Sequence, residues 1–364
     1  MPSADEATCS ITGSGLLCAR GRSPGVVANA LWAGEHSCTG RRLGTRDFPY
    51  FSLALPETDW LARAERALVS VAAQLAPFAA ETPLFIASSS FQIGHFEQQG
   101  APFDLPVANA SFSRRIGDWL QSSGPRYSFS TACISGLSAL EAARSLIAGG
   151  QIDEAIVIGC ELANNSTLAG FAAMELLSQS TCQPFDAGRD GLVLGEAVAA
   201  ARLSAQPGTW RISGLRTGID AYSATGPDPA GGPITRLMAD CLQEAGVGPA
   251  EIELIKLQAA GSPGTDLAEG NALRQVFGIY PPPLLSLKPY LGHTLGASGI
   301  VELVTLLACL AADRIPHTAG FKKVDPEIAL LPMVDRSNAH IQRALLNLIG
   351  FGGGLATMIV ERER

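Results

Sequence analysis

Charged side chains are scarce in this sequence. They make up 16% of its 364 residues, whereas hydrophobic residues make up 47%. Disordered chains have the opposite balance, because they bury too little apolar surface to offset the loss of conformational entropy. The chain is also long for a single core, since domains usually hold about 100 to 200 residues. The composition therefore predicts a core-rich globular protein built as one large unit or two fused ones.

Basic residues are outnumbered, and the formal net charge of -8 disfavours a surface for nucleic acid. Long apolar runs are absent as well. The longest, IVELVTLLACLAA at residues 300–312, is too short to cross a membrane and contains Glu302, so we predict a buried helix there. The N-terminal MPSADEATCS lacks the basic start and apolar run of a signal peptide. We therefore expect a cytoplasmic protein without a membrane segment.

The eight cysteines are scattered, and no two have the CxxC spacing typical of a metal site. A chain of this size also has no need of a disulfide framework. We therefore expect free thiols in a reducing compartment and no metal site.

Short apolar runs alternate with helical patterns along the chain. The strand-like runs are residues 83–88, 154–162, 196–203 and 355–362. The helical patterns are residues 61–75, 135–150 and 231–246. This alternation predicts an α/β layered fold. The order of elements suggests two similar halves that separate near residues 205–208, with a strand-like segment at 211–219 opening the second half.

Cys133 lies between a β-rich run and a helix of good helix formers in YSFSTACISGLSALEAARSLIAGG. A thiol at a helix N-terminus is favoured as thiolate by the helix dipole, and the free N–H groups there can form part of an oxyanion hole. Taken alone, a cysteine among small apolar residues is more often simply packed. Other segments of the chain decide between these two readings.

Four segments, taken in order, resemble the β-ketoacyl synthases of the thiolase fold. TACISGLSAL resembles the family's nucleophile segment, QPFDAGRDGLVLGEA its RPFDxxRDGFVxGEG segment, SLKPYLGHTLGASGIVEL its KxxxGHTxGAAGxxE segment, and NLIGFGGGLATMIV its NSFGFGGTNAT close. Together they cover most of the chain from Cys133 onward. The resemblance implies a thiolase-like five-layered αβαβα fold from two similar halves, here residues 1–205 and 206–364.

By this resemblance, Cys133 is the nucleophile that accepts an acyl group from a thioester. His293 matches the family's second active-site histidine, and a neutral imidazole N–H suits hydrogen bonding to a developing enolate. Lys288 and Glu302 match a buried pair that orients the site. Phe351 matches a gating phenylalanine whose N–H completes the oxyanion hole, and Gly352 and Gly353 let the backbone pass close to substrate.

One active-site histidine of the family is replaced in this chain. The family motif HGTGTPxxD has an aspartate eight residues after its histidine and a glutamate three residues later. Counting back from Asp266 and Glu269 reaches Gln258, so QAAGSPGTD stands in place of that motif. The two threonines that contact the pantetheine arm become Ala260 and Ser262.

Other polar positions change as well. The closing GGTN becomes GGGL, which ends in Gly354 and Leu355, and Gln183 replaces the arginine of RPFD. Asp186, Arg189 and Asp190 keep the loop pattern, for which we expect a structural role in a turn and a salt bridge.

Three explanations of Gln258 compete. In the first, the chain condenses acyl and malonyl thioesters, with the Gln258 amide donating the hydrogen bond that histidine gives. In the second, it is a chain-length-factor-like partner subunit of a synthase, although such partners usually lose the cysteine. In the third, it passes acyl groups on from Cys133 without condensation. We rank the explanations in this order.

The resemblance also implies partners and substrates. We expect an acyl carrier protein that delivers acyl and malonyl groups on a phosphopantetheine arm, and no bound cofactor. We further expect a homodimer, or a heterodimer with another ketosynthase, that pairs through the strand EAIVIGCEL at residues 154–162. A thiolase is disfavoured because GFGGG contains no second cysteine. An α/β hydrolase is disfavoured because no GxSxG motif occurs, and the chain also lacks a dinucleotide-binding GxGxxG segment.

Overall fold

The apolar runs of the sequence form strands of one ten-stranded sheet. The structure is a computed structural model that describes residues 9–75, 77–100, 102 and 104–363. The strands of the first half follow the order β1 (Ser10–Cys18), β8 (Ala197–Ser204), β6 (Glu154–Glu161), β4 (Leu84–Ala87) and β5 (Arg126–Phe129). The second half repeats this order with β9 (Trp210–Ile219), β13 (Gly354–Arg362), β12 (Arg343–Ile349), β10 (Leu254–Lys256) and β11 (Leu284–Leu285).

The two halves meet at β1 and β9, which pair only at one end, through Ser10 with Arg211 and Ile11 with Trp210. In both halves the strand next to the junction strand runs antiparallel to it, while the outer strands run parallel to one another. This shared order supports the expected two similar halves. The division at residues 205 and 206 stays a prediction about domains.

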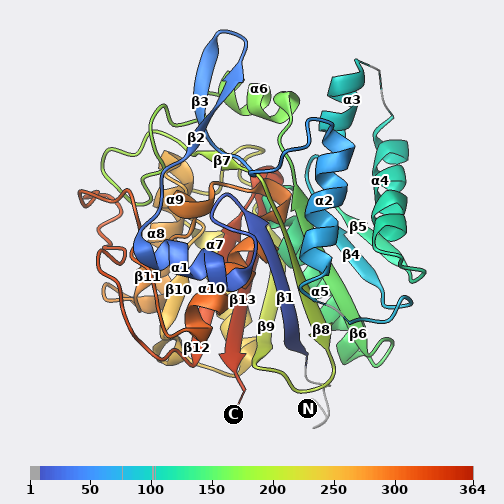
Figure 1. The fold of residues 1–364 in the computed structure, drawn as a ribbon. Coiled ribbons are helices and arrows are strands. Elements are labelled where there is room, and N and C mark those ends of the chain that lie inside the picture. Colours follow the sequence, from blue (N-terminus) through green and yellow to red (C-terminus); the bar gives the residue numbers. More distant parts are fainter. Residues whose placement is uncertain (1–8, 76, 101, 103, 364) are drawn as a thin grey trace.

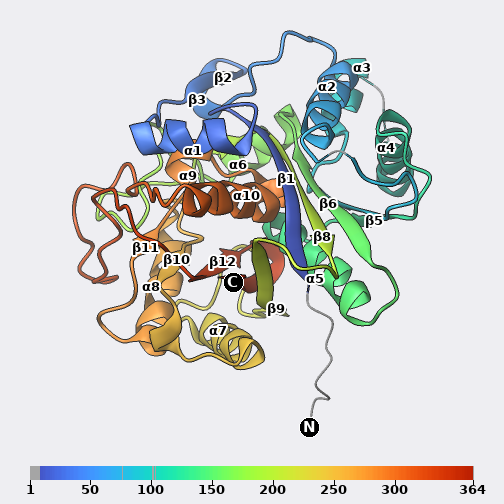
Figure 2. The ribbon, with the colours of Figure 1, turned by 60° about the horizontal axis from the view of Figure 1, so that its bottom comes forward.

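Two central helices, α5 (Ser135–Ala148) and α10 (Ser298–Ala311), lie between the two sets of strands. Helix α5 packs on β6 and β4 of the first half and also on β9 and β13 of the second. The outer faces are covered by α2 (Trp60–Ala72) and α4 (Leu105–Trp119) on one side and by α7 (Gly232–Ala245) and α8 (Pro263–Phe277) on the other, as Figures 1 and 2 show. These five layers confirm the expected fold.

The remaining elements cover the ends and edges of these layers. They are α1 (Pro24–Ala33), α3 (Ile93–Gln99), α6 (Asn165–Ala173), the short α9 (Lys288–Leu291), and the small sheet of β2 (Thr39–Leu43), β3 (Arg46–Phe51) and β7 (Leu194–Gly195). The β2–β3 hairpin projects at the top of Figure 1.

Local sequence signals explain where the outer helices begin and end. Helix α2 begins after Asp59, whose carboxylate accepts the N–H of Ala62 at 2.8 Å and so satisfies a free donor of the first turn. Helix α7 has a proline in its first turn and ends at Gly246, which adopts the left-handed conformation with φ 68°. The helices predicted from the sequence are therefore confirmed, with small differences at their ends.

Glycines allow the two central helices to approach each other closely. A Cβ atom on Gly136 of α5 would lie 2.9 Å from the backbone nitrogen of Ile300, and one on Gly299 of α10 would lie 2.7 Å from that of Leu137. Real Cβ atoms do not approach backbone so closely. Because the N-terminal turns of α5 and α10 touch, the segments that precede them also lie together.

The structure corrects the expected dimerisation strand. EAIVIGCEL forms β6, which is paired with β8 on one side and with β4 on the other, so it has no free edge. The edges of the sheet are β5 and β11. Of these, β5 exposes Arg126, Tyr127 and Ser128. The apolar run of β6 reflects burial inside the sheet, which a sequence pattern does not distinguish from burial against another chain.

Within the described residues, no helix has both the length and the apolar character needed to cross a membrane. The predicted helix at residues 300–312 is α10, whose residues are almost all buried inside the protein. Residues 1–8, which hold most of the segment assessed for a signal peptide, lie outside the described part of the chain.

Candidate active site

Cys133 occupies the middle of a 3₁₀ turn, Ala132–Ile134, that leads directly into α5. Ala132 has φ 50°, an unusual left-handed conformation for a residue with a side chain. The Ser135 hydroxyl fixes the turn, since it donates to the Ala132 carbonyl at 2.6 Å and accepts the N–H of Thr131 at 2.9 Å. The nucleophile candidate therefore lies at the start of the helix, as predicted.

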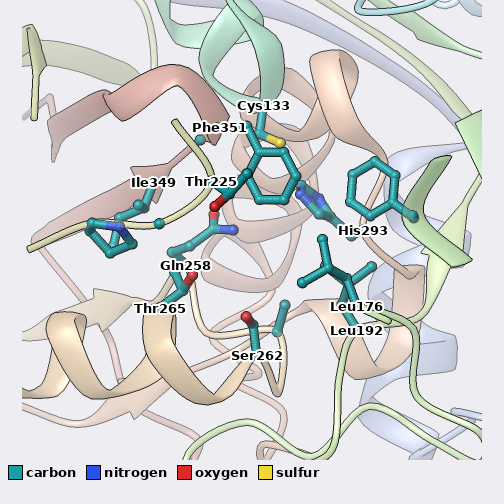
Figure 3. A pocket seen from close by; sticks show the side chains of 15 residues that line it. Cys133, Leu176, Leu192, Thr225, Gln258, Ser262, Thr265, His293, Ile349 and Phe351 are labelled. Carbon is teal, nitrogen blue, oxygen red and sulfur yellow. Dashed lines mark hydrogen bonds between the residues drawn. The ribbon is translucent and has the colours of Figure 1, made fainter. Parts of the chain in front are cut away.

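The side chain of Cys133 meets that of His293 inside the protein. The Cys133 Sγ lies 3.1 Å from His293 Nε2, and Figure 3 shows both side chains at the pocket. The other ring nitrogen, Nδ1, lies 3.0 Å from the Ser298 hydroxyl. Both side chains are buried. The backbone N–H of Phe351 also hydrogen-bonds to the Cys133 thiol. Ser298 was not identified from the sequence, although its position in GHTLGASG, at the start of α10, places it one turn from the histidine.

Burial controls the protonation of this pair. It raises the pKa of Cys133 to about 11, and the positive charge of Lys288 and the Phe351 N–H oppose the rise only in part. Burial, together with Lys288, lowers the pKa of His293 to about 3. At neutral pH the pair is therefore a thiol and a neutral imidazole. Desolvation of the Cys133 thiol therefore opposes the preference for thiolate that is expected at a helix N-terminus.

A neutral imidazole at hydrogen-bond distance can remove the thiol proton during attack. Because its pKa is so low, His293 can also present an N–H or a lone pair to substrate across the whole neutral range. The Ser298 hydroxyl can pair with Nδ1 in either tautomer, since it both donates and accepts.

Glu302 joins two buried lysines beside the histidine. Its Oε1 contacts Lys288 Nζ, which confirms the predicted pair, and its Oε2 lies 2.7 Å from Lys256 Nζ. Lys256 was not predicted as part of the site. A lysine within the apolar run LIKL of β10 is nevertheless a usable signal, because a lysine in a buried strand needs a partner of opposite charge.

The segment that contains Gln258 is fixed by the two carboxylates that identified its motif. Glu269 accepts the N–H groups of Gln258 and Ala259 at 2.7 and 2.8 Å. Asp266 accepts those of Ala260 and Gly261 at 3.1 and 3.2 Å. Both carboxylates are completely buried. Asp266 and Glu269 therefore support the segment at residues 258–261, as predicted, and hold its backbone in place.

The Gln258 side chain points into the pocket that Cys133, His293 and Phe351 also line (Figure 3). Its amide oxygen is buried without a hydrogen-bond partner among the described residues. Such a group is costly unless a water or a ligand satisfies it. The glutamine that replaces histidine therefore faces the reacting groups, and its amide is available to a substrate.

The rest of the pocket combines an apolar wall with a few hydroxyl groups. The apolar wall includes Phe171, Leu176, Leu192 and Ala260, and the hydroxyl groups come from Ser262, Thr265 and Thr225. The Ser262 hydroxyl does not cap α8, although Ser262 stands at the N-cap position. Ala260 and Ser262 therefore lie at the pocket as predicted, and Thr265 adds a hydroxyl that the sequence comparison overlooked.

Two stacked phenylalanines close the pocket. The rings of Phe351 and Phe171 are parallel within 10° and their centroids are 5.5 Å apart. The volume left free beside Cys133 is about 30 Å³, roughly the space of one water molecule. Phe351 therefore lies in the pocket wall beside Cys133, and its gating role stays a prediction.

The glycine loop after Phe351 depends on glycine. Gly352 and Gly353 have φ 72° and 74°, in the left-handed region. A Cβ atom on Gly353 would lie 1.8 Å from the carbonyl oxygen of Asp220, so no larger residue fits there. This close approach positions the Phe351 N–H beside Cys133.

The QPFDAGRDG loop has a structural role, as expected. Asp186 accepts the N–H groups of Gly188, Lys322 and Lys323, and Arg189 forms an ion pair with Asp325. Asp190 is exposed to solvent.

Comparisons with known proteins agree with the geometry. A family model for the "Beta-ketoacyl synthase, N-terminal domain" matches residues 69–206, and one for the "Beta-ketoacyl synthase, C-terminal domain" matches residues 210–322. The chain is 30% identical over 282 residues to a 3-oxoacyl-[acyl-carrier-protein] synthase 2 of Coxiella burnetii, which covers 72% of this chain and 68% of that protein.

Two solved structures have the same fold. One is a ketosynthase in complex with its chain length factor from Xenorhabdus doucetiae, with a TM-score of 0.86, 24% identity and 100% of both chains covered. The other is a type II polyketide synthase acyl-carrier protein in complex with its ketosynthase bound to the hexaketide. Its TM-score is 0.84, at 19% identity, and the match covers 99% of this chain and 100% of that one.

Proposed function

Because this chain belongs to the β-ketoacyl synthase family, we propose that it forms an acyl-enzyme on Cys133 and condenses the acyl group with a malonyl thioester. The observation that carries this proposal is the 3.1 Å contact between Cys133 Sγ and His293 Nε2 inside a pocket that Gln258 also lines. A nucleophile, a proton acceptor and two potential donors to a substrate oxygen share one buried space.

In the first half-reaction, the Cys133 sulfur attacks the carbonyl carbon of an acyl thioester. The thiol proton passes to His293 Nε2 and then to the departing carrier thiol, so that one thioester replaces another. The negative charge on the carbonyl oxygen is stabilised by backbone N–H groups, of which that of Phe351 already contacts the sulfur.

In the second half-reaction, a malonyl thioester loses CO2, and its thioester oxygen takes up negative charge as an enolate. His293 and the Gln258 amide donate hydrogen bonds to that oxygen. The enolate carbon attacks the acyl carbonyl on Cys133, and the C–S bond breaks to release a β-ketoacyl product and the cysteine sulfur. Lys288 and Glu302 hold the surroundings of His293 in place.

The substrates arrive on the phosphopantetheine arm of an acyl carrier protein. Ser262, Thr265 and the backbone around Ala260 line the side of the pocket from which the arm is proposed to approach. The solved carrier–ketosynthase complex of the same fold supports this delivery route.

We further propose that the chain pairs with a second ketosynthase chain through β5, the exposed strand at one edge of the sheet.

A second candidate is a partner subunit that shapes the cavity of a full synthase. The replacement of histidine by Gln258 favours it, as does the similar fold of a ketosynthase that is solved together with its chain length factor. The intact contact between Cys133 and His293 argues against it, because a subunit without chemistry has no need of a nucleophile paired with a base.

The test compares Gln258→His and Gln258→Leu with the parent protein. Intact-mass spectrometry follows the acyl adduct on Cys133, and a malonyl-carrier chase follows CO2 release and product. We expect Gln258→Leu to retain the adduct but to lose condensation by about 10² to 10³, the typical effect of one lost donor. Gln258→His should condense at least as fast as the parent. Gln243→Leu, on the exposed face of α7, is the matched control.

The outcomes separate the candidates. An adduct on Cys133 without an elongated product in the parent protein would indicate acyl transfer alone. Absence of any adduct, with condensation appearing only after a second ketosynthase chain is added, would favour the partner subunit.

A further inference from the structure

Lys256 is a buried charge that the proposed mechanism does not use. It has no exposed surface, and it ends β10 between two buried apolar residues, Ile255 and Leu257. The chain contains only four lysines, and two of them, Lys256 and Lys288, are buried together at Glu302. Burying an ammonium group is expensive even when it is paired. A second lysine on one carboxylate is therefore not explained by stability.

The contacts of Lys256 connect the two sides of the site. Its Nζ lies 2.7 Å from Glu302 Oε2 and donates to the Asn347 carbonyl at 3.0 Å. The Asn347 side-chain amide in turn donates to Glu269 at 2.7 Å.

Glu269 is the carboxylate that accepts the Gln258 N–H. A continuous chain of hydrogen bonds therefore runs from the Lys288–Glu302 pair, beside His293, to the backbone of Gln258. Lys256 is the link in that chain between α10 and β12.

Lys256 also changes the charge of the site. Lys288 and Glu302 alone form a neutral pair, and Lys256 adds one positive charge at full burial. Besides Glu302, Glu269 on α8 also acts on Lys256 as an opposite charge, and burial raises the pKa of Glu269. Charges in a water-excluded site act over longer distances than in solvent. An enolate oxygen between His293 and Gln258 would therefore be stabilised by this charge.

We propose that Lys256 is a positioning residue for the malonyl half-reaction, which holds the Gln258 segment to Glu302 and offsets the negative charge of the enolate. This inference rests on the proposed condensing function. Lys256 does not line the pocket around Cys133. Acyl transfer to Cys133, whose oxyanion lies at the Phe351 N–H, should therefore depend on it much less than decarboxylation does.

If Lys256 served to stabilise the fold, replacing it would lower stability. If Lys256 is a positioning residue, replacing its buried charge should leave stability unchanged or raise it. The charged and polar groups that face Lys256 are Glu302 from α10, Lys288 from α9, Glu269 from α8 and the Asn347 carbonyl from β12. Burial lowers the pKa of Lys256 to about 8, from an ordinary value near 10.5. Between these values the unfolded chain binds more protons than the folded one, so stability rises with pH. Below about pH 8 the folded protein bears the full cost of the buried charge.

The experiment uses Lys256→Met and Lys256→Gln, with Lys323→Met at an exposed position as control. Three quantities are measured at pH 7: the acyl adduct on Cys133, CO2 release from malonyl-carrier protein, and the melting temperature. For Lys256→Met we expect CO2 release to fall about tenfold or more, with adduct formation within about twofold and an unchanged or higher melting temperature. Lys256→Gln, which keeps a donor but loses the charge, should lie between Lys256→Met and the parent.

Two results would overturn the inference while leaving the proposed function intact. One is unchanged CO2 release in both variants. The other is an equal fall of adduct formation and CO2 release together with a lower melting temperature in both, which would make Lys256 structural. If the parent protein itself releases no CO2 from malonyl-carrier protein, the proposed condensation fails, and this inference fails with it.

Discussion

In each half of the molecule, a short 3₁₀ turn leads into the central helix. The turns are Ala132–Ile134 before α5 and Leu295–Ala297 before α10, and each begins with a residue in the left-handed region, Ala132 with φ 50° and Leu295 with φ 47°. At the middle position the first half has Cys133, whereas the second half has a glycine, Gly296. The same backbone frame presents a sulfur in one half and only an N–H in the other, which donates to the buried Glu161 at 3.1 Å.

The loops after β4 and β10 differ in a similar way. Glu161 accepts the N–H groups of Ser89 and Ser90, as Glu269 accepts those of Gln258 and Ala259. Buried carboxylates thus fix equivalent loops in both halves, yet only the second loop lines the pocket. The two halves share their scaffold but contribute different side chains to the pocket: Cys133 comes from the first half, and Gln258 and His293 come from the second.

The sharpest test of this division compares a cysteine from each central helix region. Cys133→Ala should abolish the acyl adduct, a loss of more than about 10³, because it removes the thiol that contacts His293 Nε2 at 3.1 Å. Cys309→Ala, buried in α10, should keep the adduct. Intact-mass spectrometry with an acyl-carrier thioester measures both. An adduct that survives in Cys133→Ala would place the nucleophile elsewhere.

The contact between the two halves can be broken at Gly299. A Cβ atom there would meet the Leu137 nitrogen at 2.7 Å, so Gly299→Ala must push α10 away from α5. We expect a loss of about 1–3 kcal/mol in the free energy of unfolding, and slower acylation as Cys133 and His293 separate. Urea unfolding measures the first effect and adduct formation the second.

Gly25→Ala is the matched control for this substitution, because a Cβ atom on Gly25 in α1 meets nothing within 4 Å. It should leave stability unchanged or raise it by up to about 1 kcal/mol, the helix preference for alanine. Equal stability of Gly299→Ala and the parent would show that the helices adjust without strain.

A smaller effect concerns pH. Burial raises the pKa of Cys133 to about 11. At any pH below that value, an increase of one pH unit therefore raises the thiolate fraction about tenfold. Alkylation of Cys133 by iodoacetamide, followed by peptide mapping, should therefore keep rising from pH 7 to pH 10. In urea, where Cys133 is an ordinary thiol, the rate should level off above about pH 9. A flat profile above pH 7 in the folded protein would contradict the burial argument.

Much of the fold follows from patterns of apolar residues. Strands β4, β6, β8 and β13 and helices α2, α5, α7 and α10 lie where periodicity predicted them, because each element buries one face or all of itself in a layer. Periodicity does not say what covers a buried strand. The resemblance did not say so either, since it predicted a subunit contact for β6, which lies inside the sheet between β8 and β4.

The motifs of the sequence by themselves determined the family, the candidate nucleophile Cys133, and the pairing of Lys288 with Glu302. They did so because several fixed spacings of uncommon residue types, found in order along one chain, are together very specific. Only the tertiary structure decided that Gln258 faces Cys133, that Lys256 joins Glu302, and that burial leaves Cys133 as a thiol. These facts depend on side chains that are far apart in the chain but buried side by side in the structure. The energies of the interactions among these side chains depend on their burial and on their separation, and both are fixed only when the layers pack together.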